Sequence, residues 1–480
     1  MPVWQRYFII FFCGLIFSCL STRLKLKSRT QKLLKKIGLI LLVFYASFLF
    51  YLTLTRYYNF SSEVIDLSYF HSTIRQLAEF KIPRVWDTPR RFVWGDHFHP
   101  ILLIFVPLYW FYQSAGLLFS LQVLIVLFGI WPLYLITKHK FKSDFLSLAF
   151  CFSYLLFGGL QMGYSYGWHE IMLFPTFFFW TWFFYETKKL KRYWFFLILT
   201  LMIKEEVAFI TFFLGLYLFL VKKARKIGFG TMVLGVFWYI LCFKIVIPYF
   251  NLDHKFTYWG YYRFTLNPLK LLQNMITPVN KIDTFFHTFG SFGFLPFLSP
   301  VTILLVIPSL MQKLLCSDIA RFNGFHYSSA ITGVTLVACV EALAKLKKRP
   351  VFWASFILFV SLFTNFYYGY RPLSFFHFRL SKVRLTDHHS LLYQVIKLIP
   401  NSASVTAQYQ LAPHFNRPFG KILDVPTKDE QQDFVLLDLK LPLVLTTPKE
   451  HREYLLNLSN NGYYQLIWEN DGILLFGKIK

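Results

Sequence analysis

Long apolar runs, separated by short polar segments, recur along most of this 480-residue sequence. An α-helix needs about 20 predominantly apolar residues to cross the hydrocarbon core of a bilayer, and several runs reach that length. The pattern predicts an α-helical polytopic membrane protein with about 11–13 transmembrane helices. The helices are expected at about 4–21, 37–55, 116–136, 144–160, 171–186, 191–203, 207–221, 228–248, 281–298, 299–315, 327–344 and 351–370.

Basic clusters beside these runs predict which helix ends face the cytoplasm. Lys and Arg in short loops are retained on the cytoplasmic side of a membrane, so both chain ends and the intervening polar segments are expected outside. A full span at 99–112 would invert the next three basic loops, so this stretch is expected to dip into the outer surface or lie on it. The clusters lie at 23–36, 138–142, 188–192, 222–226 and 345–349.

The composition excludes several other classes of protein. Hydrophobic residues make up 56% of the chain, far above the soluble average, and the formal net charge is +26. Most of the basic excess lies in the short loops, where membrane orientation and anionic lipid explain it, so nucleic-acid binding is not expected. The six cysteines lie within or beside predicted helices, which indicates no disulfide framework. The first apolar run lacks a small-residue cleavage site and is expected to be a retained helix.

Two long outer segments interrupt the helical pattern. The first, 56–98, is too polar to span, and its residues Leu67, Ile74 and Leu77 recur at helical spacing. This spacing predicts an amphipathic helix lying in the membrane interface, with Asp66 in its first turn. The second segment, about 249–280, mixes aromatic residues with charged ones that include Arg263.

From about residue 371 the composition becomes that of a small soluble domain. Strands are expected at 404–408, 434–439, 464–468 and 473–478, with helices near 387–398 and 448–460. We therefore divide the chain into an N-terminal helix with a basic cytoplasmic loop, a transmembrane domain and an extracytoplasmic α/β domain. Their bounds are 1–36, 37–370 and 371–480.

The triplet Lys204-Glu205-Glu206 interrupts what would otherwise be one apolar run. The helix before it has roughly 11 residues and rises only about 16 Å, about half the hydrocarbon thickness, so the triplet is expected in a cavity open to the outer face. Charges at that depth are expensive and usually functional. An internally neutralised Lys–Glu pair at a helix hairpin is the structural alternative.

Two further clusters of polar residues lie in outer segments. Asp96, His97 and His99 fall within four positions, and the two imidazoles could face one metal ion only if the segment is extended. Recognition of phosphate or hydroxyl groups and a divalent metal site both stay open here. His169 and Glu170 stand between two predicted helices, where they could orient a donor, serve acid–base chemistry or form a polar cap.

Asp66 is the residue that we expect to act as a general base. A carboxylate on an interfacial helix, close to a lipid head group, can accept a proton from a hydroxyl group while a lipid phosphate departs. An acid in the first turn of a helix also interacts with the helix dipole, which is the alternative role.

The order and spacing of these short motifs resemble an uncharacterised prokaryotic family of predicted membrane proteins. The resemblance covers most of the chain beyond about residue 40. It rests on Asp66-Leu67-Ser68-Tyr69-Phe70, Asp96-His97-Phe98-His99-Pro100, Leu121-Gln122, Trp168-His169-Glu170, Lys204-Glu205-Glu206-Val207-Ala208, Leu298-Ser299-Pro300, His326-Tyr327, Ile399-Pro400, Pro413-His414-Phe415 with Arg417, and Asp433-Phe434-Val435-Leu436-Leu437-Asp438.

That family is similar in architecture to the GT-C glycosyltransferases, which use polyprenyl-phosphate-linked sugars and carry an essential acid in the first outer loop. The resemblance implies a GT-C-like enzyme of a prokaryotic cytoplasmic membrane, with Asp66 at the catalytic position. It would move a sugar from a polyprenyl-phosphate donor to a lipid, glycan or protein acceptor at the outer face. The remaining pocket residues would bind substrate: Asp96, His97, His99, His169, Glu170, Lys204, Glu205, Glu206 and Arg263.

This sequence departs from the family pattern at three positions. Ser68 stands where Gly is typical, and His71-Ser72 stands where an acid and an amide often follow. These positions bear on the acceptor and on metal preference, and His97 and His99 are the candidate metal ligands. Two other functions compete with the transferase: a transporter or flippase of lipid-linked glycans, and a non-catalytic envelope assembly protein. The absence of a visible inverted repeat counts against the transporter.

Overall fold

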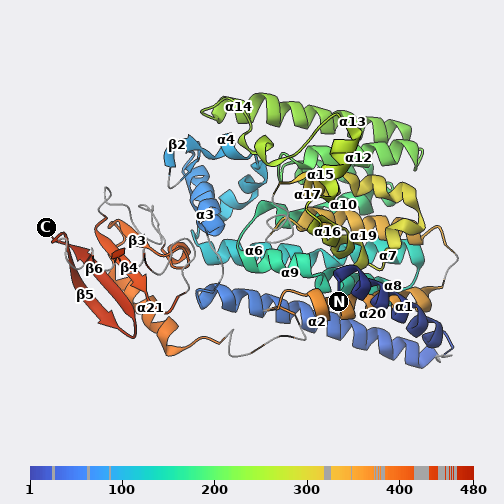
Figure 1. Ribbon diagram of the computed structural model, residues 1–480, viewed down its shortest axis with the longest axis horizontal. Helices are drawn as coiled ribbons and strands as arrows, with labels where there is room; N and C mark the ends of the chain where they lie inside the picture. The colour runs from blue at the N-terminus through green and yellow to red at the C-terminus, as the bar shows by residue number, and fades with distance from the viewer. Residues whose placement is uncertain are drawn as a thin grey trace.

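The chain folds into a helical bundle with a small β-sheet domain at one end (Figure 1). The computed structural model describes residues 1–23, 28–61, 65–85, 88–317, 326–346, 349–371, 373–374, 377, 379, 384–415, 432–441, 449, 453–454, 456, 458 and 462–479.

Most of the bundle helices lie where the apolar runs predict them. They are α1 (Val3–Ser21), α2 (Ser28–Tyr58), α6 (Ala115–Phe128), α7 (Ile130–Phe141), α8 (Asp144–Leu156), α9 (Gly158–Tyr166), α10 (Phe174–Glu186), α11 (Leu190–Leu201), α12 (Val207–Leu220), α13 (Arg225–Ile240), α16 (Asn280–Gly290), α17 (Ile307–Leu315), α19 (Ser329–Leu343) and α20 (Pro350–Tyr368).

Within the described part of the chain, five helical stretches are long and apolar enough to cross a bilayer. The bent pair α8 and α9 adds a sixth if it counts as one span. The sequence-based number of about 11–13 spans also includes shorter helices, such as α12 and α19. The five stretches are Val3–Ser21, Arg29–Tyr58, Ala115–Phe141, Arg225–Phe250 and Pro350–Tyr368.

Local sequence signals account for several helix starts. The side chains of Ser114 and Ser143 accept hydrogen bonds from the backbone amides of Leu117 and Leu146, which caps α6 and α8. Helices α10, α17 and α20 each carry a proline in their first two positions, where the missing backbone donor costs nothing.

The closest helix packing depends on glycine. A Cβ atom at Gly215 of α12 would lie 2.6 Å from the backbone nitrogen of Met232 and 2.7 Å from the carbonyl oxygen of Gly228 in α13. Larger side chains there would force the helices apart, so these small residues allow the two backbones to approach directly. This packing fixes the helix α12 that follows the Lys204-Glu205-Glu206 triplet.

Three expected helices are interrupted. The run expected at 228–248 is α13, a π-helical turn η3 (Leu241–Val246) and α14 (Ile247–Phe250), because Pro248 offers no amide to the carbonyl four residues before it. In the run expected at 281–298, helix α16 ends at Gly290. Gly293 then has a φ of 62°, which does not continue a right-handed helix. The run expected at 299–315 forms two helices, η6 (Pro300–Leu305) and α17, and Pro308 lies in the first two positions of α17. The short helix η5 (Leu295–Leu298) precedes them.

The first outer segment folds as a compact unit on the bundle. Helix α3 (Ile65–Ala78) forms where it was expected, and it buries Leu67, Phe70 and Ile74. The stretch after it contains the hairpin β1 (Arg84–Val85) and β2 (Thr88–Phe92) and the turn α4 (Val93–Asp96). The sequence did not predict this hairpin, because its strands are polar and lack alternating apolar residues. Residues 100–109 form only the short helices η1 (Pro100–Phe105) and α5 (Val106–Tyr109).

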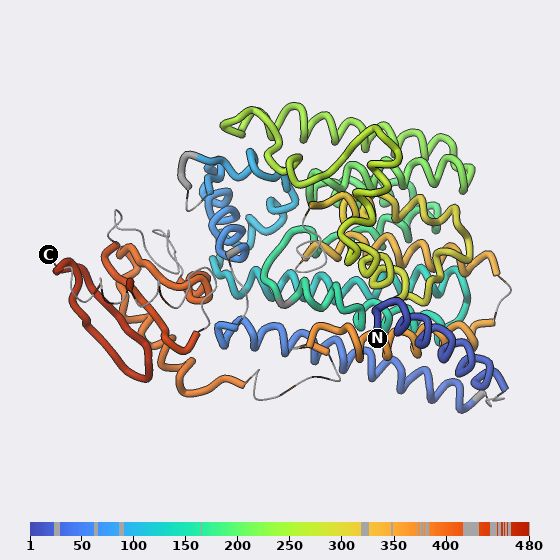
Figure 2. The backbone as a smooth tube through the Cα atoms, viewed as in Figure 1, coloured from blue at the N-terminus to red at the C-terminus, as the bar shows by residue number. Residues whose placement is uncertain are grey.

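The second outer segment contains η4 (Thr257–Tyr261) and α15 (Pro268–Ile276). It lies against the first: the side chain of Asn251 donates a hydrogen bond to the carbonyl oxygen of Gly95 at 2.8 Å. In Figure 2 the blue tube of α3 and α4 accordingly lies close to the green tube of α14. Two segments far apart in the sequence therefore meet above the helices.

At the other helix ends, four charged side chains form a closed ring. Lys140 lies 2.6 Å from Glu186 and 2.9 Å from Glu341, and Lys222 lies 2.9 Å and 2.5 Å from the same two carboxylates. Each charge has two partners of opposite sign, as buried charges require. The ring joins the ends of α7, α10, α12 and α19, so two of the basic clusters share one end of the bundle.

The C-terminal sheet region predicted from the sequence is confirmed. Its strands β3 (Val405–Ala407), β4 (Phe434–Asp438), β5 (Tyr464–Asn470) and β6 (Ile473–Lys478) are arranged in the order β3-β4-β6-β5. Strands β3 and β4 are parallel, and the other pairs are antiparallel. Helix α21 (Asp387–Leu398) packs on the face that carries Leu436 and Leu475, while Val435 and Phe476 face the other side with Tyr454 and Leu458. This alternation follows the two-residue period of a strand.

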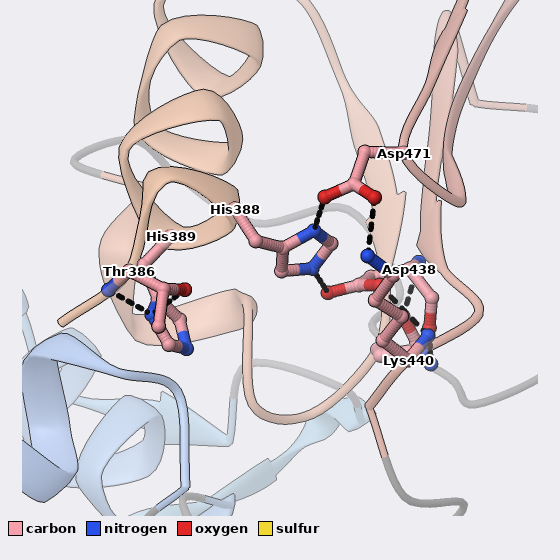
Figure 3. Close-up of polar contacts among 7 residues, drawn as sticks. Thr386, His388, His389, Asp438, Lys440 and Asp471 are labelled. Carbon is pink, nitrogen blue, oxygen red and sulfur yellow. Dashed lines mark hydrogen bonds and ion pairs between the residues drawn. The ribbon is translucent and has the colours of Figure 1, made fainter. Parts of the chain in front are cut away.

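A histidine joins α21 to the sheet (Figure 3). The Nε2 atom of His388 lies 2.9 Å from Oδ2 of Asp438, and its Nδ1 atom lies 2.8 Å from Oδ2 of Asp471. Lys440 also bonds Asp471. Both ring nitrogens of His388 thus contact carboxylate oxygens, which joins α21 to the end of β4 and to the turn between β5 and β6.

The sheet domain docks on the end of α2. Phe60, which follows α2, is fully buried in the domain core, with its ring 4.9 Å from Tyr393 and 4.3 Å from His414. Tyr57 stacks on His414 at 4.4 Å. The short helix η8 (Ala412–His414) contacts α3 and α6. The domain therefore supports the helix that carries Asp66.

Candidate active site

A cavity of about 910 Å³ opens between the two outer segments and the bundle. Its walls come from α3, α4, α12, α17, the turns at 166–170 and 204–206, and the loop at 256–264. We call it the outer cavity. Its ionisable lining, tyrosines apart, consists of Asp66, Arg91, Asp96, His97, His169, Glu170, Lys204, Glu205, Glu206 and His326.

Asp66 and His169 form an ion pair at the side of this cavity. Oδ2 of Asp66 lies 2.9 Å from Nε2 of His169, and the two side chains are 29% and 9% exposed. Gln122 holds the turn that carries the histidine: its Oε1 atom accepts from the His169 backbone amide at 2.5 Å, and its Nε2 atom donates to the Gly167 carbonyl at 2.9 Å. The carboxylate is thus partly open while its partner is fixed.

The pair changes the pKa of both members. Burial acts to raise the pKa of Asp66, but the charge and hydrogen bond of His169 and a hydrogen bond from Tyr166 together outweigh it, so the pKa of the carboxyl is lowered from its ordinary value. Burial acts to lower the pKa of His169, but the charges and hydrogen bonds of Asp66 and Glu170 together outweigh it, so the pKa of the imidazole is raised. The geometry therefore favours a carboxylate beside an imidazolium.

A second histidine, His326, stacks on His169. The centroids of the two imidazole rings lie 3.3 Å apart, with an interplanar angle of 24°. Burial lowers the pKa of His326, and the charge of His169 lowers it further. A neutral aromatic face beside an imidazolium is favourable, so His326 supports the charged form of His169.

Lys204 and Glu170 form a buried ion pair at the bottom of the cavity. Nζ of Lys204 lies 3.1 Å from Oε1 of Glu170, with the side chains 7% and 1% exposed. The other carboxylate oxygen, Oε2, has no hydrogen-bond partner among the described residues. The pair removes two opposite charges from water together, so each charge compensates the other.

The two acids after Lys204 have separate partners. Oε1 of Glu205 lies 2.7 Å from Nδ1 of His97, and its Oε2 atom accepts from the Phe98 amide at 3.1 Å. Oε2 of Glu206 accepts from the side-chain amide of Gln312 at 2.6 Å. Both the structural Lys–Glu pair and the cavity that the sequence suggested are therefore present at this triplet.

The structure brings most of the expected site residues together. Asp66, Asp96, His169, Glu170 and the 204–206 triplet line one cavity with His97. His99 and Arg263 do not line it. His99 is buried, and neither of its ring nitrogens has a hydrogen-bond partner among the described residues. Arg263 is exposed on the second outer segment, with its backbone amide bonded to the Leu315 carbonyl.

The histidines at 97 and 99 do not fit a shared metal ion. The ring of His97 stacks on Tyr258 at 4.7 Å and its Nδ1 atom bonds Glu205, whereas His99 lies outside the cavity. Within the described residues, no group of three or more His, Cys, Asp or Glu side chains is arranged to hold a metal.

Sequence reasoning missed several side chains of the cavity. His326 and the supporting Gln122 were quoted only as parts of motifs, and nothing in the sequence placed them beside His169. Arg91 bonds Asp96 and lines the cavity, but it belongs to the hairpin that had no sequence signal. Gln312 lies in a segment that was expected to be an ordinary helix.

The sequence matches, over residues 56–475, the model of a predicted membrane protein family, DUF2079. The chain belongs to this family. The fold is also that of two crystal structures of ArnT from Cupriavidus metallidurans, one bound to undecaprenyl phosphate and one in the apo state. Their TM-scores are 0.55 and 0.52 at 10% sequence identity, over 92% of this chain and 98% of ArnT. No curated protein matches the sequence.

This likeness confirms the GT-C-like architecture predicted from the sequence. At 10% identity it shows the fold alone and assigns no role to a residue.

The Asp66–His169 pair predicts a coupling energy that depends on pH. Because its pKa is raised, His169 contributes fully to the free energy of unfolding below about pH 6.5, and this contribution is lost as the pH rises through its folded pKa. Because its pKa is lowered, Asp66 contributes fully above about pH 3.9, and its contribution is lost as the pH falls through its folded pKa. A double-mutant cycle with Asp66→Asn and His169→Gln, measured by thermal unfolding in detergent, should give about 0.5–3 kcal/mol near pH 6 and less near pH 9.

The partly exposed pair Arg75 and Glu79, whose atoms lie 3.2 Å apart, is the control. Its cycle should give about 0.3–0.5 kcal/mol at both values of pH, because neither an arginine nor a glutamate titrates between pH 6 and pH 9. A coupling for Asp66 and His169 that does not change between them would contradict the charged pair.

Proposed function

We propose that the chain is a GT-C-like glycosyltransferase that moves a sugar from a polyprenyl-phosphate donor to an acceptor hydroxyl. The observation that carries the proposal is the partly open Asp66 carboxylate, paired with His169, in a cavity that also holds the buried Lys204. The fold of ArnT, whose crystal structure holds undecaprenyl phosphate, supports a lipid-linked phosphate as the donor.

The reaction needs one base and one cation. The acceptor oxygen forms a bond to the anomeric carbon, the bond from that carbon to the phosphate oxygen breaks, and polyprenyl phosphate leaves with the bonding electrons. The hydroxyl proton passes to Asp66. Glycosyl transfer has an oxocarbenium-like transition state, in which the hydroxyl becomes acidic as the new bond forms, so a carboxylate of lowered pKa can accept its proton.

The cations of the cavity would bind the donor phosphate. Lys204 and Arg91 both line it, and charge-assisted hydrogen bonds from such groups are strong where water is scarce. The apolar side of the same cavity, which includes Phe209, Phe213 and Leu271, suits the prenyl chain. One cavity thus offers a charged end for the phosphate and an apolar side for the lipid.

The outer cavity would face away from the cytoplasm. The basic clusters at 138–142 and 222–226 meet in the charged ring, at the helix ends away from the sheet domain. Basic residues retained in the cytoplasm would place the sheet domain and the cavity outside, in a prokaryotic cytoplasmic membrane.

Replacing Asp66 tests the base. Asp66→Asn keeps the size of the side chain but cannot take up the proton, so the transfer rate should fall about 10²–10⁴-fold. The measurement is single-turnover transfer from polyprenyl-phosphate sugars in proteoliposomes, with donor-lipid binding measured alongside and expected to survive. Asp253→Asn, the same change on the exposed second outer segment, is the control. A normal rate for Asp66→Asn would exclude Asp66 as the base.

Replacing Lys204 separates phosphate binding from structural support. Lys204→Met leaves the Glu170 carboxylate buried and unpaired, which should destabilise the protein by about 3–5 kcal/mol. Adding Glu170→Gln removes that unpaired charge, so thermal stability should recover while sugar transfer stays low. Recovery of both stability and transfer in the double variant would instead show that the pair is only structural.

Cysteine labelling tests the orientation. Cys13 and Cys19 are exposed, so single cysteines are introduced after both are changed to Ser. Cysteines replacing Phe80 and Leu466 should react with an impermeant maleimide in intact cells, or in spheroplasts if an outer envelope is present. Cysteines replacing Leu190 and Lys223 should react only after the membrane is opened. The reverse pattern would place the outer cavity on the cytoplasmic side and overturn this part of the proposal.

A further inference from the structure

A second cavity, of about 380 Å³, lies on the other side of α17. Helix α17 presents Gln312 to the outer cavity and Lys313 to the second one. The turn at 326–328 also contacts both cavities: Tyr327 lines the outer cavity, and Ser328 lines the second one. The two cavities therefore share a wall but have different linings.

Polar side chains of α16 face this second cavity. Asp283, His287 and Ser291 follow one another at four-residue spacing, which places them on one side of the helix, and all three line the cavity. Ile282, beside Asp283 in the sequence, is exposed instead. An acid in the first turn also interacts with the helix dipole, but that role does not require it to face a cavity inside a membrane bundle.

Aromatic rings complete the lining. The Tyr7 ring of α1 stacks on Tyr368 of α20, with centroids 4.8 Å apart and planes 8° apart. The Tyr7 hydroxyl lies 2.9 Å from Nδ1 of His287 and 3.3 Å from Oγ of Ser291. The phenol oxygen of Tyr368 is bonded by the Arg6 side chain, and the Tyr368 side chain lines the cavity.

We infer that this second cavity binds a neutral polyhydroxylated group, such as a glycosyl or polyol unit. A carboxylate, an imidazole and several hydroxyls can accept from and donate to the many hydroxyls of such a ligand, and Phe157 and Met162 supply apolar lining for its carbon faces. The lining contains one acid, Asp283, and one lysine, Lys313, so it favours neither sign of charge and suits a neutral ligand. The inference does not depend on the proposed glycosyl transfer, since the site stands apart from Asp66.

Binding of octyl β-glucoside, kept below its micelle concentration, tests this site in the full-length protein in nanodiscs. Tetraethylene glycol monooctyl ether has the same alkyl chain without the sugar hydroxyls, and methyl β-glucoside has the sugar without the chain. Octyl glucoside should bind saturably and at least tenfold more tightly than the ether. If methyl glucoside binds as tightly as octyl glucoside, a soluble sugar is a sufficient ligand. If it binds more weakly, the ligand is a lipid-linked sugar. Both results support the site.

Variants locate the binding. Asp283→Asn and, independently, His287→Gln should each weaken octyl glucoside binding about tenfold, because each removes one polar partner of the ligand. Asp253→Asn and Asp66→Asn should leave it unchanged, the latter because Asp66 lies in the outer cavity. Equal binding of octyl glucoside and the ether, or loss of binding in Asp66→Asn alone, would overturn the inference. If one of the variants Asp283→Asn and His287→Gln fails to fold, the other still locates the binding.

Discussion

A charge buried in a helical bundle is costly unless it is paired or hydrogen-bonded, and the ion pairs that meet this requirement join several of the helices. At the bottom of the outer cavity Lys204 pairs with Glu170, and at the helix ends away from the sheet domain Lys140 and Lys222 pair with two acids. Each pair joins segments that are distant in the sequence. The cost of an unpaired buried charge therefore fixes how the helices meet, and it also fixes which cations line the cavity.

The candidate site depends on this framework through the outer segments. Asp66 belongs to α3, which packs on the bundle with Leu67 and Phe70 and contacts the C-terminal domain through η8. His169 is held by Gln122 from α6. The Asp66 carboxylate is thus partly open while its partner His169 is fixed. The proposed role of Asp66 as a base uses this arrangement, with His169 as its electrostatic support.

The sequence predicted the elements whose causes are local. Apolar runs located the helices, and the change of composition near residue 371 located the small sheet. The Lys204 triplet lies between α11 and α12, as the interruption of the apolar run predicted. The break after Gly290 and the position of His326 against His169 depend on tertiary packing, which no local pattern encodes. His99 and Arg263 were misplaced for the same reason, because a residue type indicates chemistry but not the direction of its side chain.

The central claim is that the outer cavity carries out sugar transfer, and the most direct test uses the wild-type protein in proteoliposomes. A panel of polyprenyl-phosphate sugars is presented with candidate acceptors, and release of polyprenyl phosphate is measured together with movement of the donor lipid across the bilayer. The account predicts that at least one donor loses its sugar to an acceptor hydroxyl and releases polyprenyl phosphate. Robust lipid translocation, with no transfer from any donor, would contradict it and favour a flippase.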